Sequence, residues 1–67
     1  MHRHLQDRDR KNNYTILAES SYLDGNKEKA IEFYNKSLQF EGDRDEDIGI
    51  LYDLAIIYDE LDIPLKA

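Results

Sequence analysis

The chain has 67 residues, a formal net charge of −6 at neutral pH and no cysteine. This length allows one small domain, and the lack of thiols excludes disulfides and cysteine-ligated metals as supports for its core. A chain without cysteine fits a reducing compartment, so we expect an intracellular location, cytoplasmic or organellar. Because no apolar run approaches the ~20 residues that cross a bilayer, we expect no membrane insertion.

The charge is distributed unevenly along the chain. Residues 1–12 carry a net charge of +2, whereas residues 13–67 carry −8. An acidic body repels phosphate backbones and attracts cationic partners weakly and in a salt-sensitive way. We therefore expect no nucleic-acid partner. The simplest interpretation of the acidic surface is that it keeps the chain soluble.

Residues 1–11 form the first predicted segment, a flexible basic arm. Leu5 is its single large apolar side chain, so the arm buries too little surface to offset the entropy lost on ordering. A one-turn extension of the first helix is the alternative. His2 and His4 suggest a metal-binding arm as a further alternative, but two ligands on a flexible segment make a weak site. We expect no metal or other cofactor.

The first helix is predicted over residues 13–24, with Asn12 or Asn13 as its cap. Gly25 should end it, because glycine adopts the left-handed closing conformation at little cost. Apolar and small side chains recur at three- and four-residue steps and define the face expected to be buried: Tyr14, Leu17, Ala18, Ser21 and Tyr22.

Two further helices are predicted over residues 27–40 and 48–61, with Asn26 and Asp47 as their caps. An acidic loop, residues 41–47, joins them. Pro64 suits the first turn of a fourth helix that would start at residues 64–67. The buried positions expected in the second helix are Ala30, Ile31, Tyr34, Ser37, Leu38 and Phe40, and those in the third are Leu51, Leu54, Ala55, Tyr58 and Leu61.

Parts of the first two helices recur 37 residues further along the chain. Leu17 and Ala18 recur as Leu54 and Ala55, and Ala30 recurs as Ala67. A constant period in this range is typical of helical arrays, in which no single unit buries its own apolar face. The pattern therefore predicts an interaction scaffold rather than a catalyst.

The repeated residues resemble a tetratricopeptide repeat (TPR), with about one and a half repeats over residues 12–67. The chain departs from the family pattern at Ser21 and Ser37, where tyrosine and alanine are common, and its period exceeds the usual roughly 34 residues. The resemblance implies an all-α fold, an antiparallel helical hairpin plus a third helix that form a fragment of a right-handed solenoid. It is carried by Tyr14, Leu17, Ala18, Gly25, Ala30, Tyr34, Leu38 and Phe40.

The resemblance also implies a function in protein–protein interaction, as a scaffold, adaptor or assembly chaperone. In such arrays the first helices line a concave groove, which a basic or apolar protein segment would fit here, since aromatic anchors supply affinity and carboxylates select charge. Residues 38–55 also resemble, more weakly, a plastid photosystem I assembly factor of this family, which implies a plastid as one location. The implied partner-binding residues are Thr15, Glu19, Tyr22, Tyr52, Ile56 and Asp59.

Catalytic chemistry has little support in the sequence, and we expect no enzyme. The serines lack a histidine at a plausible spacing. Asp43, Asp45 and Asp47 alternate like a calcium loop, but Ile48 and Leu54 stand where that loop needs glycine and glutamate. The principal alternative is a structural subunit or self-associating module, because an incomplete array leaves an apolar end face.

Overall fold

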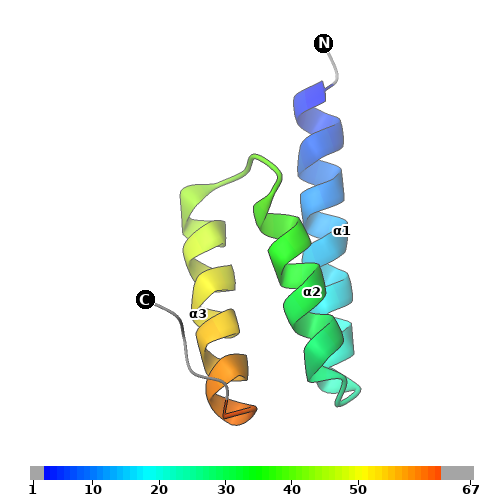
Figure 1. Cartoon of the computed structure of the whole chain (residues 1–67). Helices are drawn as coiled ribbons and strands as arrows, with labels where there is room; N and C mark the ends of the chain where they lie inside the picture. Colours follow the sequence, from blue (N-terminus) through cyan, green and yellow to red (C-terminus); the bar gives the residue numbers. More distant parts are fainter. Residues whose placement is uncertain (1–2, 63–67) are drawn as a thin grey trace.

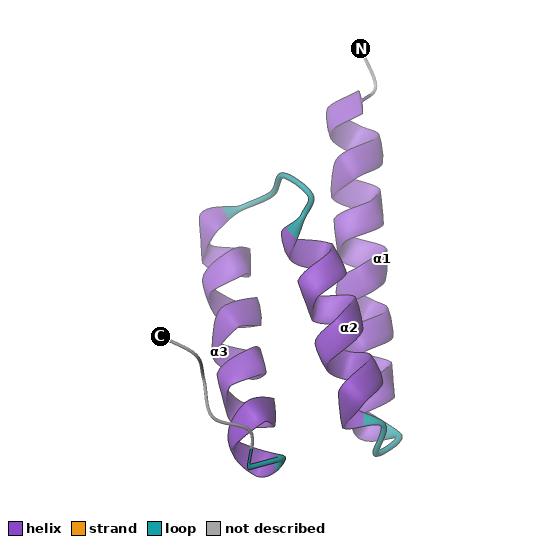
Figure 2. Ribbon diagram, in the orientation of Figure 1, coloured by secondary structure: helices purple, strands orange, loops and turns teal. Residues whose placement is uncertain are grey.

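The computed structural model describes residues 3–62, including the backbone but not the side chains of residues 3–6. Three helices form within this range: α1 (Arg3–Leu23), α2 (Lys27–Leu38) and α3 (Arg44–Glu60). Successive helices are antiparallel, and α2 lies between α1 and α3 (Figure 1). The described residues contain no strand (Figure 2). The predicted all-α hairpin plus third helix is therefore confirmed, whereas the fourth helix predicted at residues 64–67 lies outside the described residues.

The turn between α1 and α2 follows from Gly25 and Asn26. Gly25 has a φ of +87°, the left-handed conformation that favours glycine. Its N–H donates to the Tyr22 carbonyl at 3.0 Å, and the Asn26 N–H donates to the Ser21 carbonyl at 2.8 Å, which together satisfy two terminal carbonyls of α1. The Asn26 side chain then accepts from the Lys29 N–H and caps α2, as expected from the sequence.

Two helix starts differ from the sequence-based expectation. The predicted flexible arm, residues 1–11, is wrong in its described part, because α1 already begins at Arg3. Asp43, rather than Asp47, caps α3 by accepting from the Asp45 N–H. Asp45, Glu46 and Asp47 then fall in the first turn of α3, where carboxylates interact favourably with the helix dipole.

The core joins one face of each helix. Ala18 and Ala30 are fully buried, so α1 and α2 approach closely where their side chains are small. Tyr34 of α2 packs in the same cluster with three residues of α3, namely Ile50, Leu54 and Ile57. The core is thus built around α2, which has a neighbouring helix on each side.

Two leucines predicted to be buried lie at the surface. Leu17 is 45% exposed and Leu51 is 55% exposed, so both assignments were wrong. Leu17 is neither in the core cluster nor among the apolar residues packed against it. In α3 the buried face is rotated by one residue, because Ile50, Leu54 and Ile57 face α2 and Leu51 does not.

An aromatic stack reinforces the contact of α1 with α2 and with the segment that follows α2. The Tyr14 ring is stacked on Phe33, with centroids 6.1 Å apart, and on Phe40, with centroids 5.8 Å apart. The Lys29 ammonium lies over the Phe33 ring, at 5.7 Å from its centroid. Offset aromatic pairs of this kind stabilise packing beyond the area they bury.

Lys11 of α1 is buried and binds the end of α2. Its side chain is only 1% exposed, and its ammonium donates to the carbonyls of Ser37 at 2.9 Å and Phe40 at 3.3 Å. Ser37 lies in the last turn of α2 and Phe40 just beyond its end, so the ammonium lies at the C-terminal end of the helix, where a cation is favourable. The Lys11 ammonium also forms an ion pair with Asp47, in which it lies 2.5 Å from the Oδ1 atom. This Oδ1 atom is buried and has no other polar contact among the described residues.

The close approach of Ala18 and Ala30 leads to a stability prediction. Ala30→Leu should lower the free energy of unfolding by about 1–3 kcal/mol, since the larger side chain overpacks the contact between α1 and α2. Asn35→Leu, on an exposed position of the same helix, should change it by about 0.5 kcal/mol or less. Urea denaturation measures both variants, and equal effects would contradict the close contact at Ala30.

Candidate functional site: a pocket between α1 and α3

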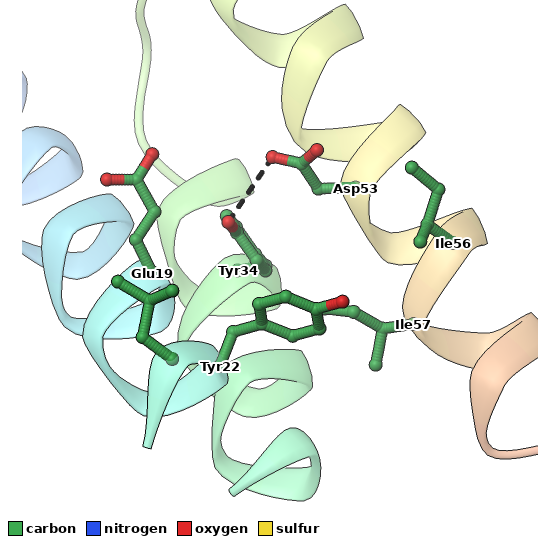
Figure 3. Close-up of a pocket in the computed structure, with 7 residues that line it drawn as sticks. Glu19, Tyr22, Tyr34, Asp53, Ile56 and Ile57 are labelled. Carbon is green, nitrogen blue, oxygen red and sulfur yellow. Dashed lines mark hydrogen bonds between the residues drawn. The ribbon is translucent and has the colours of Figure 1, made fainter. Parts of the chain in front are cut away.

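A pocket of about 340 Å³ opens between α1 and α3, with α2 behind it. Glu19 comes from the α1 wall and Asp53 from the α3 wall, and Tyr34 of α2 lies between them (Figure 3). Most of its remaining lining is apolar or aromatic. The lining residues are Glu19, Tyr22, Leu23, Tyr34, Asp53, Ile56 and Ile57.

Tyr34 and Asp53 form the polar centre of the pocket. The Tyr34 hydroxyl donates to Asp53 Oδ2 at 3.3 Å, as the dashed line in Figure 3 marks. Burial raises the pKa of Tyr34 well above its ordinary value, and the charge of Asp53, its hydrogen bond and the charge of Glu19 add to the increase. The phenol therefore stays protonated near neutral pH and keeps Asp53 oriented as an acceptor.

Tyr22 is held in place by Glu60 near the C-terminal end of α3. Its hydroxyl lies 2.8 Å from both Glu60 carboxylate oxygens. This hydrogen bond is the main cause of a raised pKa for Tyr22, so its phenol also stays protonated near neutral pH. Lys27, at the start of α2, lies 3.6 Å from Glu60 Oε1. One carboxylate thus connects all three helices at this end of the pocket.

The structure brings together half of the partner-binding residues predicted from the sequence. Glu19, Tyr22 and Ile56 line the pocket. Thr15 does not, because its hydroxyl bonds the Lys11 carbonyl at 2.9 Å and the Ser37 hydroxyl at 2.7 Å, within the contact between α1 and α2. Tyr52, 68% exposed, and Asp59, also exposed, lie outside the pocket on α3.

Four lining residues were missed: Leu23, Tyr34, Asp53 and Ile57. Tyr34 was assigned to the core, and it does pack there, but its hydroxyl also reaches the pocket. Asp53, Ile56, Ile57 and Glu60 follow one another at three- and four-residue steps around Ile57, which places them on one side of α3. That spacing was the available signal in the sequence, and it was masked by the apolar residues on the other sides of α3.

A second hollow, of about 520 Å³, lies at the opposite end of the hairpin, beside the loop between α2 and α3. Its lining is mainly polar and carries both signs of charge, with Arg8 and Asp47 among its residues. Asp47 is already paired with the buried Lys11 ammonium. We therefore take the pocket between α1 and α3 as the candidate site.

Metal binding and membrane crossing have no support in the described part of the chain. Residues 7–62 contain no cluster of three or more histidine or carboxylate side chains arranged to hold a metal ion. The side chains of His2 and His4 lie outside the described residues. None of the three described helices has the length and apolar character needed to cross a bilayer.

Comparison of the chain with family models, with curated proteins and with solved structures gave no match.

Proposed function

We propose that this chain is a TPR-like repeat scaffold, without catalytic activity, that binds a segment of another protein in the pocket between α1 and α3. The observation that carries this proposal is the pocket itself, which is concave, largely apolar and lined by aromatic side chains with a few oriented polar groups. Surfaces of this composition are typical of binding sites. Its polar groups are carboxylates and phenols, and its lining offers no nucleophile paired with a base.

The internal repeat supports the scaffold assignment. Position 54 of α3 corresponds to position 17 of α1, and Leu54 packs against α2 whereas Leu17 is exposed. In turn Tyr14, which stacks on the α2 residue Phe33, corresponds to the exposed Leu51. This is what an array predicts, because each first helix contacts its own second helix with one face and the preceding second helix with the other.

Substitutions in the pocket test the proposal. Peptides that bind the folded chain would be selected from a random library and their affinities measured by fluorescence polarisation. Leu23→Ala/Ile56→Ala should weaken their binding by about tenfold or more, because both side chains line the pocket without belonging to the buried core. Ile48→Ala/Tyr52→Ala removes two exposed apolar side chains outside the pocket and should leave binding nearly unchanged.

A second candidate function is supported by the exposed apolar residues of α3. Ile48 and Tyr52, four residues apart, and Leu51 beside them are all exposed and lie outside the pocket. Such a face suits a structural subunit or self-associating module. Light scattering separates the two functions. The structural role replaces the scaffold role under two conditions. The chain must be a fixed oligomer that Ile48→Ala/Tyr52→Ala dissociates, and Leu23→Ala/Ile56→Ala must have no effect on peptide binding.

A narrower version of the proposal follows from the weaker resemblance. Residues 38–55 are similar in pattern to a plastid assembly factor, so we propose an assembly chaperone in a plastid as the specific form of the scaffold role. Isolation of an assembly intermediate with the tagged chain from plastids would support this version. A uniform distribution of the chain outside organelles would contradict it and leave the general scaffold proposal in place.

A further inference from the structure

We propose that the segment bound in the pocket inserts one arginine side chain, whose guanidinium is held between Glu19 and Asp53. This inference rests on the proposed function, since it specifies the residue that anchors the bound segment. It goes further by assigning one side chain of the partner to one pocket of this chain. Three features of the pocket carry it: its uncompensated carboxylates, its immobilised tyrosines and its apolar walls.

The two carboxylates of the pocket lack the cationic neighbours that two other acidic side chains of α3 have. Asp47 is paired with Lys11, and Glu60 lies near Lys27. For Glu19 and Asp53, no cation among the described residues lies within ion-pair distance. The two acids stand on facing walls, and both contribute to the raised pKa of Tyr34 between them. A cationic group from outside would compensate both charges (Figure 3).

Asp53 is oriented to accept from such a group. Tyr34 donates to its Oδ2 atom, and no hydrogen bond from the described residues reaches its Oδ1 atom. Holding one carboxylate oxygen fixes the direction of the other, so less conformational entropy is lost when a donor arrives. Tyr34 is thus a positioning residue for Asp53 rather than a direct contact for the guanidinium.

The rest of the pocket suits the remainder of an arginine side chain. Ile56, Ile57 and Leu23 offer apolar surface to the three methylene groups of the stem. The Tyr22 ring, held by Glu60, offers an aromatic face on which a planar guanidinium can stack. Arginine fits better than lysine, because its planar fork can donate to two carboxylates and stack on a ring at the same time.

The experiment uses the peptides selected from the random library on the folded chain. In each arginine-containing peptide, the arginines are replaced one at a time by citrulline, which keeps the shape and removes the charge. One replacement should weaken binding at least about tenfold, since hydrogen bonds to charged groups are the strong ones. Replacement of the same arginine by lysine should also weaken binding, by a smaller factor.

Charge-removing variants of the chain locate the arginine. Glu19→Gln/Asp53→Asn should weaken binding of the arginine peptide about tenfold or more, and binding of the citrulline peptide less than about twofold. The citrulline peptide is little affected because the amides keep the shape of the pocket, and the amide oxygen at position 53 can still accept from the Tyr34 hydroxyl. Asp59→Asn removes one carboxylate from the same helix outside the pocket and should have little effect on either peptide. A similar loss in all variants would indicate general attraction to the acidic surface and would overturn the inference.

The outcomes distinguish this inference from the function on which it rests. If tight peptides lack arginine and still depend on Leu23 and Ile56, the binding pocket stands and the arginine anchor is wrong. If arginine peptides bind but Glu19→Gln/Asp53→Asn changes nothing, the anchor lies elsewhere and the inference is again wrong. If no peptide binds the folded chain, both the proposed function and the arginine anchor fail.

Discussion

Replacing Lys11 by methionine should lower the free energy of unfolding by about 2–4 kcal/mol, one of the largest single-residue effects in this chain. Methionine keeps most of the apolar stem but removes the donor that serves the Ser37 and Phe40 carbonyls and the cation that pairs with Asp47. A core of this size rarely supplies more than about 3–5 kcal/mol. We therefore expect circular dichroism at room temperature to show a largely unfolded variant.

Two controls separate the buried role of Lys11 from simple charge removal. Arg10→Met removes the same charge from the adjacent, exposed position and should change stability by about 0.5 kcal/mol or less. Asp47→Asn should cost less than Lys11→Met, since Lys11 keeps both carbonyls and the Asp47 side chain is about one-third exposed. If Arg10→Met and Lys11→Met have equal effects, Lys11 is not buried at the end of α2.

The buried Lys11 side chain also restricts which residue can stand at position 42 of the loop between α2 and α3. A Cβ atom at Gly42 would overlap the Cδ and Cε atoms of the Lys11 stem. These atoms belong to a side chain that is fixed at its far end by two carbonyls and a carboxylate, so the stem cannot move aside without breaking those contacts. Glycine at position 42 is therefore required by the close approach of the loop.

Leu54→Ala is the second change with a large expected effect. Leu54 is 5% exposed and packs in the core against α2, so its truncation should cost about 2–5 kcal/mol. This cost approaches the stability of the whole domain and falls on the contact between α3 and α2. We therefore expect α3 to detach from α2. The amide protons of α3 should then exchange with solvent much faster than in the parent chain, as NMR would measure.

Leu51→Ala is the matched control, the same substitution three residues earlier in the same helix. Leu51 is exposed, and its truncation should change stability by about 0.5 kcal/mol or less. The pair therefore measures the rotation of α3 about its axis. A loss for Leu51→Ala as large as that for Leu54→Ala would mean that α3 also buries Leu51, as expected from the sequence and against what the structure shows.

The position of α2 was predictable because its signals are local. Asn26 caps the helix and Gly25 closes the one before it, and the structure has both contacts. The predicted start at Lys27 is confirmed, and the predicted end at Phe40 is two residues beyond the observed end at Leu38. Capping and turn chemistry depend on neighbours in the chain, so both can be predicted from the sequence.

The burial of Lys11 in α1 was not predictable in this way, because its partners lie far along the chain. Lys11 becomes buried through contacts with residues 26, 29 and 36 positions away. No periodicity predicts such a contact, and a lysine is ordinarily expected to be exposed. Asp47, which pairs with Lys11, lies in the first turn of α3, and Asp43, the first aspartate of the loop, caps the helix instead.

The face of α3 was ambiguous because apolar residues occur on every side of this helix. From residue 48 to residue 58, all but Gly49 and Asp53 are apolar or aromatic. Leu51, Leu54 and Tyr58 fit one three- and four-residue pattern, whereas Ile50, Leu54 and Ile57 fit another. Only the packing against α2 decides between the two patterns. The same ambiguity affects the candidate site, where Ile56 was predicted correctly but Asp53 and Ile57 on the same side of α3 were not.

The docking of α3 on α2, which makes α1 and α3 the two walls of one pocket, is most directly tested by NMR nuclear Overhauser effects. We expect cross-peaks between the Tyr22 ring and the Glu60 methylenes, and between the Tyr34 ring and the Asp53 methylene. If both pairs lack cross-peaks while the Tyr14 and Phe33 rings retain theirs, the hairpin is intact but α3 does not form the second wall, and the pocket does not exist as described.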